Sequence, residues 1–202
     1  MNRMLWRQLG SFLLLVAATA CLGEQTTKKE NEPEQTVFGA DPQPQEFIRK
    51  PVQVPPAALQ VLRDSLGRGT LNCLKHNGIT TDDVPASWFV ASEIHLDGPE
   101  EIDLIVQPNL PKIGTDELPH HEAFGCVLGA NVGPFWVLKN TNGRYGLLLA
   151  TYALGLEVLD SRSNFYHDIQ ATAATAGTVT KVLYKMSVAQ YQFAEKKTDP
   201  LM

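Results

Sequence analysis

The sequence has no surplus of positive charge. Its 17 Lys and Arg residues are outnumbered by 22 Asp and Glu residues, which gives a formal net charge of −5. A protein that binds nucleic acid needs a basic surface to meet the phosphates, so we expect no nucleic-acid partner. The chain also lacks a glycine-rich phosphate loop and the strand–helix alternation of nucleotide-binding α/β folds.

Recognisable catalytic motifs are missing as well. No serine stands in a Gly-x-Ser-x-Gly elbow, and the HExxH metalloprotease pattern is absent, because residues 123–125 after His121 and Glu122 are Ala-Phe-Gly. His167 and Asp168 are neighbours on a predicted strand, so their side chains should point to opposite faces and not form an acid–base pair. The sequence therefore favours a protein that is not an enzyme.

No membrane-spanning helix is predicted, but the N-terminus reads as an export signal. The apolar run at residues 12–18 is well short of the roughly 20 residues that a helix needs to cross a bilayer. Arg3 and Arg7 precede this run, and the small residues Ala18-Thr19-Ala20 follow it, which is the pattern of a secretory signal peptide. Without residues 1–21, fifteen Lys and Arg residues face twenty-two acids, so the mature net charge is −7.

Two interpretations of the cleavage at the end of this signal compete. Ala18-Thr19-Ala20 fits an ordinary signal-peptidase site, which would release a soluble protein. The same residues followed by Cys21 resemble the bacterial lipobox, although Ala18 stands where Leu is usual. That resemblance implies a lipidated Cys21 and a protein held at a membrane, on the periplasmic or outer-membrane side of the cell envelope.

Cysteine is scarce, with three residues in the chain. If Cys21 carries the anchor, Cys73 and Cys126 remain. An even pair in an oxidising compartment favours a disulfide. Two separate buried thiols are the alternative, and a catalytic thiol is a third.

The composition changes along the chain and predicts three parts. Residues 1–21 are the signal peptide, and residues 22–55 form a disordered, proline-rich linker whose last part leans on the domain. Residues 56–196 form a β-rich globular domain. It begins with a helix at 55–67, because proline suits the first turn and Gly67 suits the end, and a second helical turn is expected at 71–76.

Beyond residue 80 the hydrophobic period is two, which predicts strands. The clearest hairpin signal is Asn142-Gly143 between two apolar runs, because both residues tolerate positive φ. We expect an antiparallel meander of the sandwich, barrel or propeller-blade type, with a long loop at 108–133 and its aromatic residues in the core. The predicted strands are 88–96, 102–106, 134–139, 145–151, 156–160, 166–173, 178–186 and 190–194.

An acidic segment at residues 93–106 suggests a cation site. It resembles the calcium loop and following strand of bacterial FG-GAP or integrin-like (VCBS-like) repeats, and the likeness extends faintly to residues 134–195. The resemblance implies Ca²⁺ ligands at Glu93, Asp97, Glu101 and Asp103, since Ca²⁺ takes six to eight oxygens. His95 replaces the usual Asn or Asp and Leu96 replaces a small residue. An acidic hairpin without an ion is therefore the alternative.

These observations lead to one main hypothesis about function. The chain is expected to be a non-enzymatic envelope lipoprotein whose β-domain binds a protein or glycan partner through the 108–133 loop. One alternative is a metal-dependent envelope hydrolase that uses His120, His121, Glu122 or the acids near Asp97. Another is an inhibitor of a basic lytic enzyme, which the acidic charge would suit.

Overall fold

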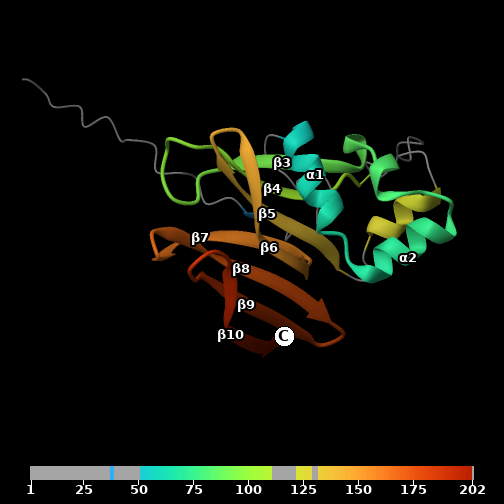
Figure 1. The fold of residues 1–202 in the computed structure, drawn as a ribbon. Helices are drawn as coiled ribbons and strands as arrows, with labels where there is room; N and C mark the ends of the chain where they lie inside the picture. Colours follow the sequence, from blue (N-terminus) through green and yellow to red (C-terminus); the bar gives the residue numbers. More distant parts are fainter. Residues whose placement is uncertain (1–36, 39–50, 111–121, 129–131, 202) are drawn as a thin grey trace, which may run out of the picture. The chain divides into compact units, whose positions relative to one another are not determined.

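The computed structural model describes residues 37–38, 51–110, 122–128 and 132–201. Contacts divide the chain into two units, Met1–Glu32 and Pro33–Met202, and every described residue belongs to the second. This unit is mainly β, with two five-stranded antiparallel sheets and no closed barrel among its described strands (Figure 1). The predicted fold class is therefore confirmed, in its open, two-sheet form.

Most helical segments lie before the longer strands, and one lies among them. The helices are α1 (Pro56–Asp64) and α2 (Arg68–His76), and the 3-10 turns are η1 (Thr81–Asp83), η2 (Ala86–Trp88) and η3 (Glu122–Val127). Pro56 occupies the first turn of α1, where its missing N–H costs nothing, and Leu62 buries its side chain completely. Arg63 at the end of α1 donates hydrogen bonds to the carbonyl oxygens of Asp82 and Val84, and so holds η1 against the helix.

Apart from β1, the earlier strands form one sheet and the later strands form the other. One sheet has the order β2-β3-β4-β5-β6 and the other has the order β1-β7-β8-β9-β10. Leu154 connects β6 to β7 and donates its N–H to the Thr172 carbonyl, so the chain changes sheets there. The bounds are β1 (Val37–Phe38), β2 (Pro51–Val52), β3 (Phe89–Ile94), β4 (Asp103–Pro108), β5 (Gly133–Thr141), β6 (Arg144–Ala153), β7 (Gly155–Ser163), β8 (Tyr166–Thr175), β9 (Thr178–Met186) and β10 (Tyr191–Pro200).

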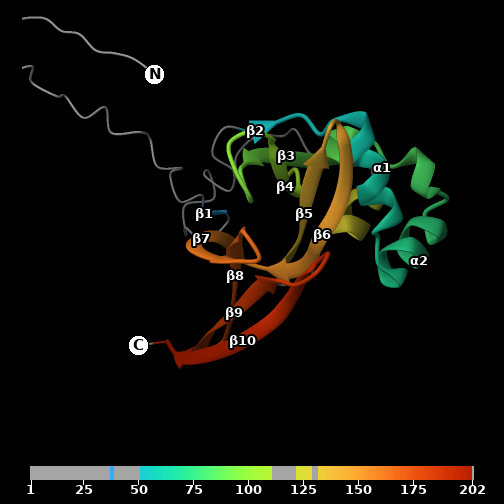
Figure 2. The same cartoon turned by 60° about the vertical axis from the view of Figure 1, so that its left-hand side comes forward.

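The side chains of β4 alternate between the two faces of the first sheet and so contribute to two hydrophobic cores. Leu104 and Val106 join a cluster that includes the buried residues of α1, α2 and η3. Ile105 points to the opposite face and joins a second cluster with Leu156 and Ile169 of the other sheet. Figure 2 shows the first sheet between the helices and the second sheet. Both faces of β4 are covered, which accounts for the burial of every residue in the strand.

Several expectations need correction. Two short strands, β1 and β2, lie in the predicted linker and pair with β7 and β3, and the pairing of β2 agrees with the expectation that the last part of the linker leans on the domain. The rest of residues 22–50, and Cys21, lie outside the described residues. The predicted loop at 108–133 contains η3, because Ala123, Phe124 and Val127 are buried in the first core cluster. Two of the aromatic residues assigned to the core are exposed, namely Tyr152 (56%) and Phe193 (62%).

Among the described residues, no helix combines the length and the apolar character that a membrane span requires.

Candidate functional site

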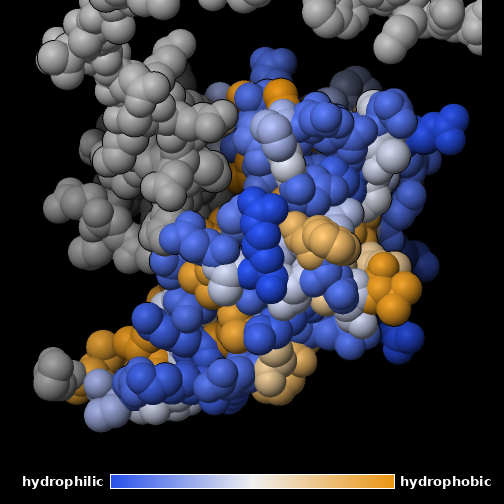
Figure 3. Space-filling view, turned by 90° about the vertical axis from the view of Figure 1, so that its left-hand side faces the viewer, coloured by the Kyte–Doolittle hydropathy of each residue, from blue (hydrophilic) through white to orange (hydrophobic). Residues whose placement is uncertain are grey.

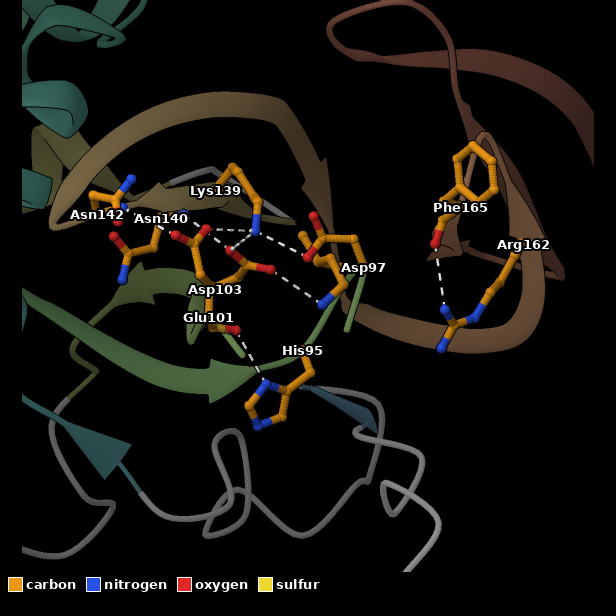
Figure 4. Close-up of polar contacts among 10 residues, drawn as sticks. His95, Asp97, Glu101, Asp103, Lys139, Asn140, Asn142, Arg162 and Phe165 are labelled. Carbon is orange, nitrogen blue, oxygen red and sulfur yellow. Dashed lines mark hydrogen bonds and ion pairs between the residues drawn. The ribbon is translucent and has the colours of Figure 1, made fainter. Parts of the chain in front are cut away.

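A charged cluster lies at the end of the first sheet, around Lys139 of β5 (Figure 4). Its ammonium Nζ lies 2.9 Å from Asp97 Oδ1, 3.1 Å from Glu101 Oε2 and 3.2 Å from Asp103 Oδ1. The lysine side chain is 13% exposed and the Asp103 side chain is completely buried. Three carboxylates, two from the β3–β4 loop and one from the start of β4, therefore share one partly buried cation.

Backbone groups fix the orientation of these carboxylates. Asp103 accepts hydrogen bonds from the N–H groups of Leu96 (3.1 Å) and Asn140 (2.9 Å), and Glu101 accepts one from Asn142 (3.0 Å). The β5–β6 turn positions its donor because Asn142 and Gly143 both have positive φ, as the Asn-Gly hairpin prediction requires. The hairpin was predictable, and it places a backbone donor against the acidic loop.

The environment raises the pKa of Asp103 and of Lys139 and lowers the pKa of Glu101. Burial raises the pKa of Asp103, against the opposing effect of its hydrogen-bond donors. The Asn142 N–H and then Lys139 lower the pKa of Glu101. Burial disfavours the Lys139 cation, but hydrogen bonds to Asp97 and Glu101 and the charge of Asp103 raise its pKa well above the usual range. The cluster is thus a charge-paired lysine at neutral pH.

Three of the four predicted calcium ligands therefore do come together, but around an ammonium group. Glu93 is exposed on β3, and it makes no ion pair with Lys139. No set of three or more His, Cys, Asp or Glu side chains in the described part of the chain is arranged to hold a metal ion. Sequence reasoning missed Lys139, which lies 36 residues beyond Asp103 and reaches it only through β4–β5 pairing.

A second candidate site is an apolar pocket of about 240 Å³ at the opposite ends of the same strands. It lies where β4 ends, β5 begins and β6 ends, so both ends of the 108–133 segment contribute to it. None of its lining residues is charged. They are Gln107, Pro108, Leu110, Leu128, Val132, Gly133, Pro134, Phe135, Ala153 and Leu154.

Exposed apolar side chains surround this pocket. Leu110 is 46% exposed and Leu154 is 38% exposed, and Tyr152 lies opposite Pro134 in the β5–β6 ladder. Gln107 is 94% buried and, among the described residues that line the pocket, is the only one with a polar side chain. The pocket is therefore suited to an apolar group that carries a hydrogen-bonding atom near Gln107.

Cys73 of α2 and Cys126 of η3 form a disulfide. The bond holds η3 against α2, and η3 is also held by Phe124, whose ring packs edge-on against Trp88 at a centroid distance of 5.6 Å. Leu128, which lines the pocket, follows two residues after Cys126. The disulfide thus supports one wall of the pocket.

Of the residues in the hydrolase hypothesis, the acids near Asp97 surround Lys139. Glu122 is exposed at the start of η3, and His120 and His121 lie outside the described residues. His167 and Asp168 are both buried and have different partners: Arg162 donates to His167 Nε2, and Ser161 donates to Asp168. These contacts agree with the expectation that the two side chains do not pair.

The chain was also compared with known proteins. No protein-family model, no curated protein sequence and no solved structure matches it.

Proposed function

We propose that this protein is an exported, lipid-anchored module of the cell envelope that binds a partner at the apolar pocket. The leader and Cys21 support the address, because a basic start, a short apolar run and small residues precede the cysteine. The Cys73–Cys126 disulfide supports the same address, since structural disulfides persist mainly in oxidising compartments. The anchor would keep the domain at a membrane, where its partner is met.

The pocket is the observation that carries the binding proposal. It joins both ends of the 108–133 segment, is lined almost wholly by apolar groups, and has exposed leucines at its rim. Recognition of a glycan would need several polar side chains, whereas the described part of the lining offers the polar side chain of Gln107 alone. A protein partner that inserts an aliphatic or aromatic side chain fits the lining better, and its backbone amide would pair with Gln107.

Site-specific photo-crosslinking tests this proposal. A photoreactive benzophenone amino acid placed at Leu154, on the pocket rim, is expected to give a discrete adduct with an envelope protein in intact cells. The matched control is the same group at Leu71 of α2. Both leucines are 38% exposed, but only Leu154 lines the pocket.

A second variant, without the photoreactive group, checks by co-purification that binding of the cross-linked partner depends on the pocket. Leu154→Arg places a charge at the apolar rim and is expected to lower recovery of that partner at least tenfold, which corresponds to about 1.4 kcal/mol. Leu71→Arg should leave recovery unchanged. Equal crosslinking from both positions, or no loss in Leu154→Arg, would contradict binding at the pocket.

A further inference from the structure

The most exposed large hydrophobic side chains of the described region lie at two neighbouring hairpin turns. Phe165 in the β7–β8 turn is 85% exposed, and Val188 in the β9–β10 turn is 99% exposed. The turns lie at the same end of the second sheet, and the Asn164 side chain donates a 2.8 Å hydrogen bond to the Met186 carbonyl oxygen. We call Phe165 and Val188 the apolar tips.

The backbone at Phe165 is unfavourable for the residue it carries. Asn164 has φ +49° and Phe165 has φ +72°, so both lie in the left-handed region. Asparagine tolerates this conformation, but a phenylalanine there is strained, and glycine is the usual residue at such a position. The Arg162 guanidinium donates to the Phe165 carbonyl and helps to hold the turn. An aromatic ring that is both strained and exposed contributes little to stability, which points to a role outside the fold.

Strand β1 begins on the side that faces the same end of the sheet. In β1, Val37 lies opposite Glu157 and Phe38 lies opposite Leu156 of β7. Because the pairing is antiparallel, Val37 is the residue of β1 that lies nearer to the β7–β8 turn. Fifteen residues lie between Cys21 and Val37, and a chain of that length reaches at most about 55 Å when extended. The turn is only about 25 Å along the strand from Glu157, so an anchor at Cys21 lies within reach of the tips.

We propose that Phe165 and Val188 insert into the surface of the lipid layer that holds Cys21. The inference rests on the lipid anchor of the proposed function. Acyl chains hold the protein at the membrane, and two apolar side chains at one end would then orient the domain on it. Where Figure 3 shows this side of the molecule, most of the surface is hydrophilic, with separate hydrophobic patches between, and the proposed contact is limited to the two turns.

Charges of both signs lie near the tips. The β3–β4 loop lies beside them, because the His167 N–H donates to the Leu96 carbonyl oxygen at 2.8 Å. Asp97 and Glu101 of this loop are paired with Lys139, and Arg162 donates to the carbonyl oxygen of Phe165 itself. Because these charges largely offset one another, a zwitterionic surface is the better match.

Fluorescence quenching in vesicles tests the contact. The full chain, expressed with its leader in a bacterium, is purified as the Phe165→Trp variant and incorporated into phosphatidylcholine vesicles that contain brominated chains. The two native tryptophans of the described region, Trp88 and Trp136, are buried and provide a constant background. The expected result is loss of most of the emission that Phe165→Trp adds, with little loss in a Leu71→Trp control. Figures 1 and 2 both show α2, which carries Leu71, on the far side from the β7–β8 turn.

The outcomes separate the two proposals. A mass without acyl chains, or failure to float with vesicles, removes the anchor and with it the tip contact. An acylated, floating protein whose Phe165→Trp emission is not quenched overturns the tip contact alone, and so does equal quenching of the Leu71→Trp control. Quenching that appears only when a protein partner is added would assign the tips to that partner instead of lipid and would also overturn the proposal.

Phe165→Gly provides an independent measurement. Glycine removes the strain and the exposed ring, so the melting temperature is expected to stay unchanged or to rise. Quenching of a tryptophan at Val188 (Val188→Trp) should weaken in this background. A lower melting temperature would show that Phe165 serves the fold, which contradicts the inference.

Discussion

Replacing Lys139 with methionine is expected to lower the free energy of unfolding by about 3 kcal/mol. Removal of one partner from a buried ion pair typically costs about 3–5 kcal/mol, because the remaining charge stays buried without compensation. Here the remaining charge is Asp103, which is completely buried, with Asp97 and Glu101 beside it at 30% and 31% exposure. The lower end of the range applies since those two acids retain contact with water.

Urea unfolding measures this effect. Lys181→Met is a suitable control, because Lys181 is an exposed lysine on a strand of the other sheet and makes no ion pair with a described residue. It should change the unfolding free energy by less than about 0.5 kcal/mol. A Lys139→Met variant as stable as the Lys181→Met control would mean that the cluster does not hold the β3–β4 loop to β5.

Loss of the disulfide is expected to have the largest effect of any change outside the core. For the 53-residue separation between Cys73 and Cys126, the chain-entropy model gives about 4 kcal/mol of stabilisation. The free energy of unfolding of a native domain is typically about 5–15 kcal/mol. Loss of the disulfide would therefore remove a large part of it. The Cys73→Ser/Cys126→Ser double variant is therefore expected to unfold at much lower urea concentration than the oxidised protein.

Alkylation of the oxidised protein under denaturing conditions provides the control. Neither Cys73 nor Cys126 should react until a reductant is added, and afterwards both should. If both thiols react without reductant, the pair is not bonded in the natural protein. If the double variant and the oxidised protein unfold at the same urea concentration, the bond exists but adds no stability.

Local signals made much of the fold predictable. The β5–β6 hairpin follows from Asn142-Gly143, two residues whose side chains permit the positive φ angles of the turn. By contrast, the sequence predicts an irregular loop where η3 lies, although Ala123, Phe124 and Val127 have the spacing of one helical face. The glycines and prolines around this short apolar stretch indicate a loop and outweigh its helical spacing.

Whether an individual aromatic residue is buried depends on contacts that a short stretch of sequence does not reveal. Tyr152 lies on β6, an edge strand of its sheet, and Phe193 lies on β10, the edge strand of the other. Alternation assigns a face to each residue but does not reveal whether that face is covered at an edge. Both residues are exposed for this reason.

The candidate sites were predictable only in part. The acidic residues around Asp97 are close together in the sequence, so a cluster could be predicted from it. Lys139 is about forty residues away in the sequence and joins the cluster only because β4 pairs with β5. The apolar pocket needs the ends of three strands at once. The length of the segment at 108–133 predicted a binding region there. The apolar character of the pocket also depends on Ala153 and Leu154, which are distant in the sequence.

Intact mass combined with detergent partitioning tests the central proposal most directly. Natively expressed protein should begin at Cys21, carry the added mass of acyl chains and enter the detergent phase. A chain that retains residues 1–20, or a water-soluble one without acyl chains, would contradict a lipid-anchored envelope protein.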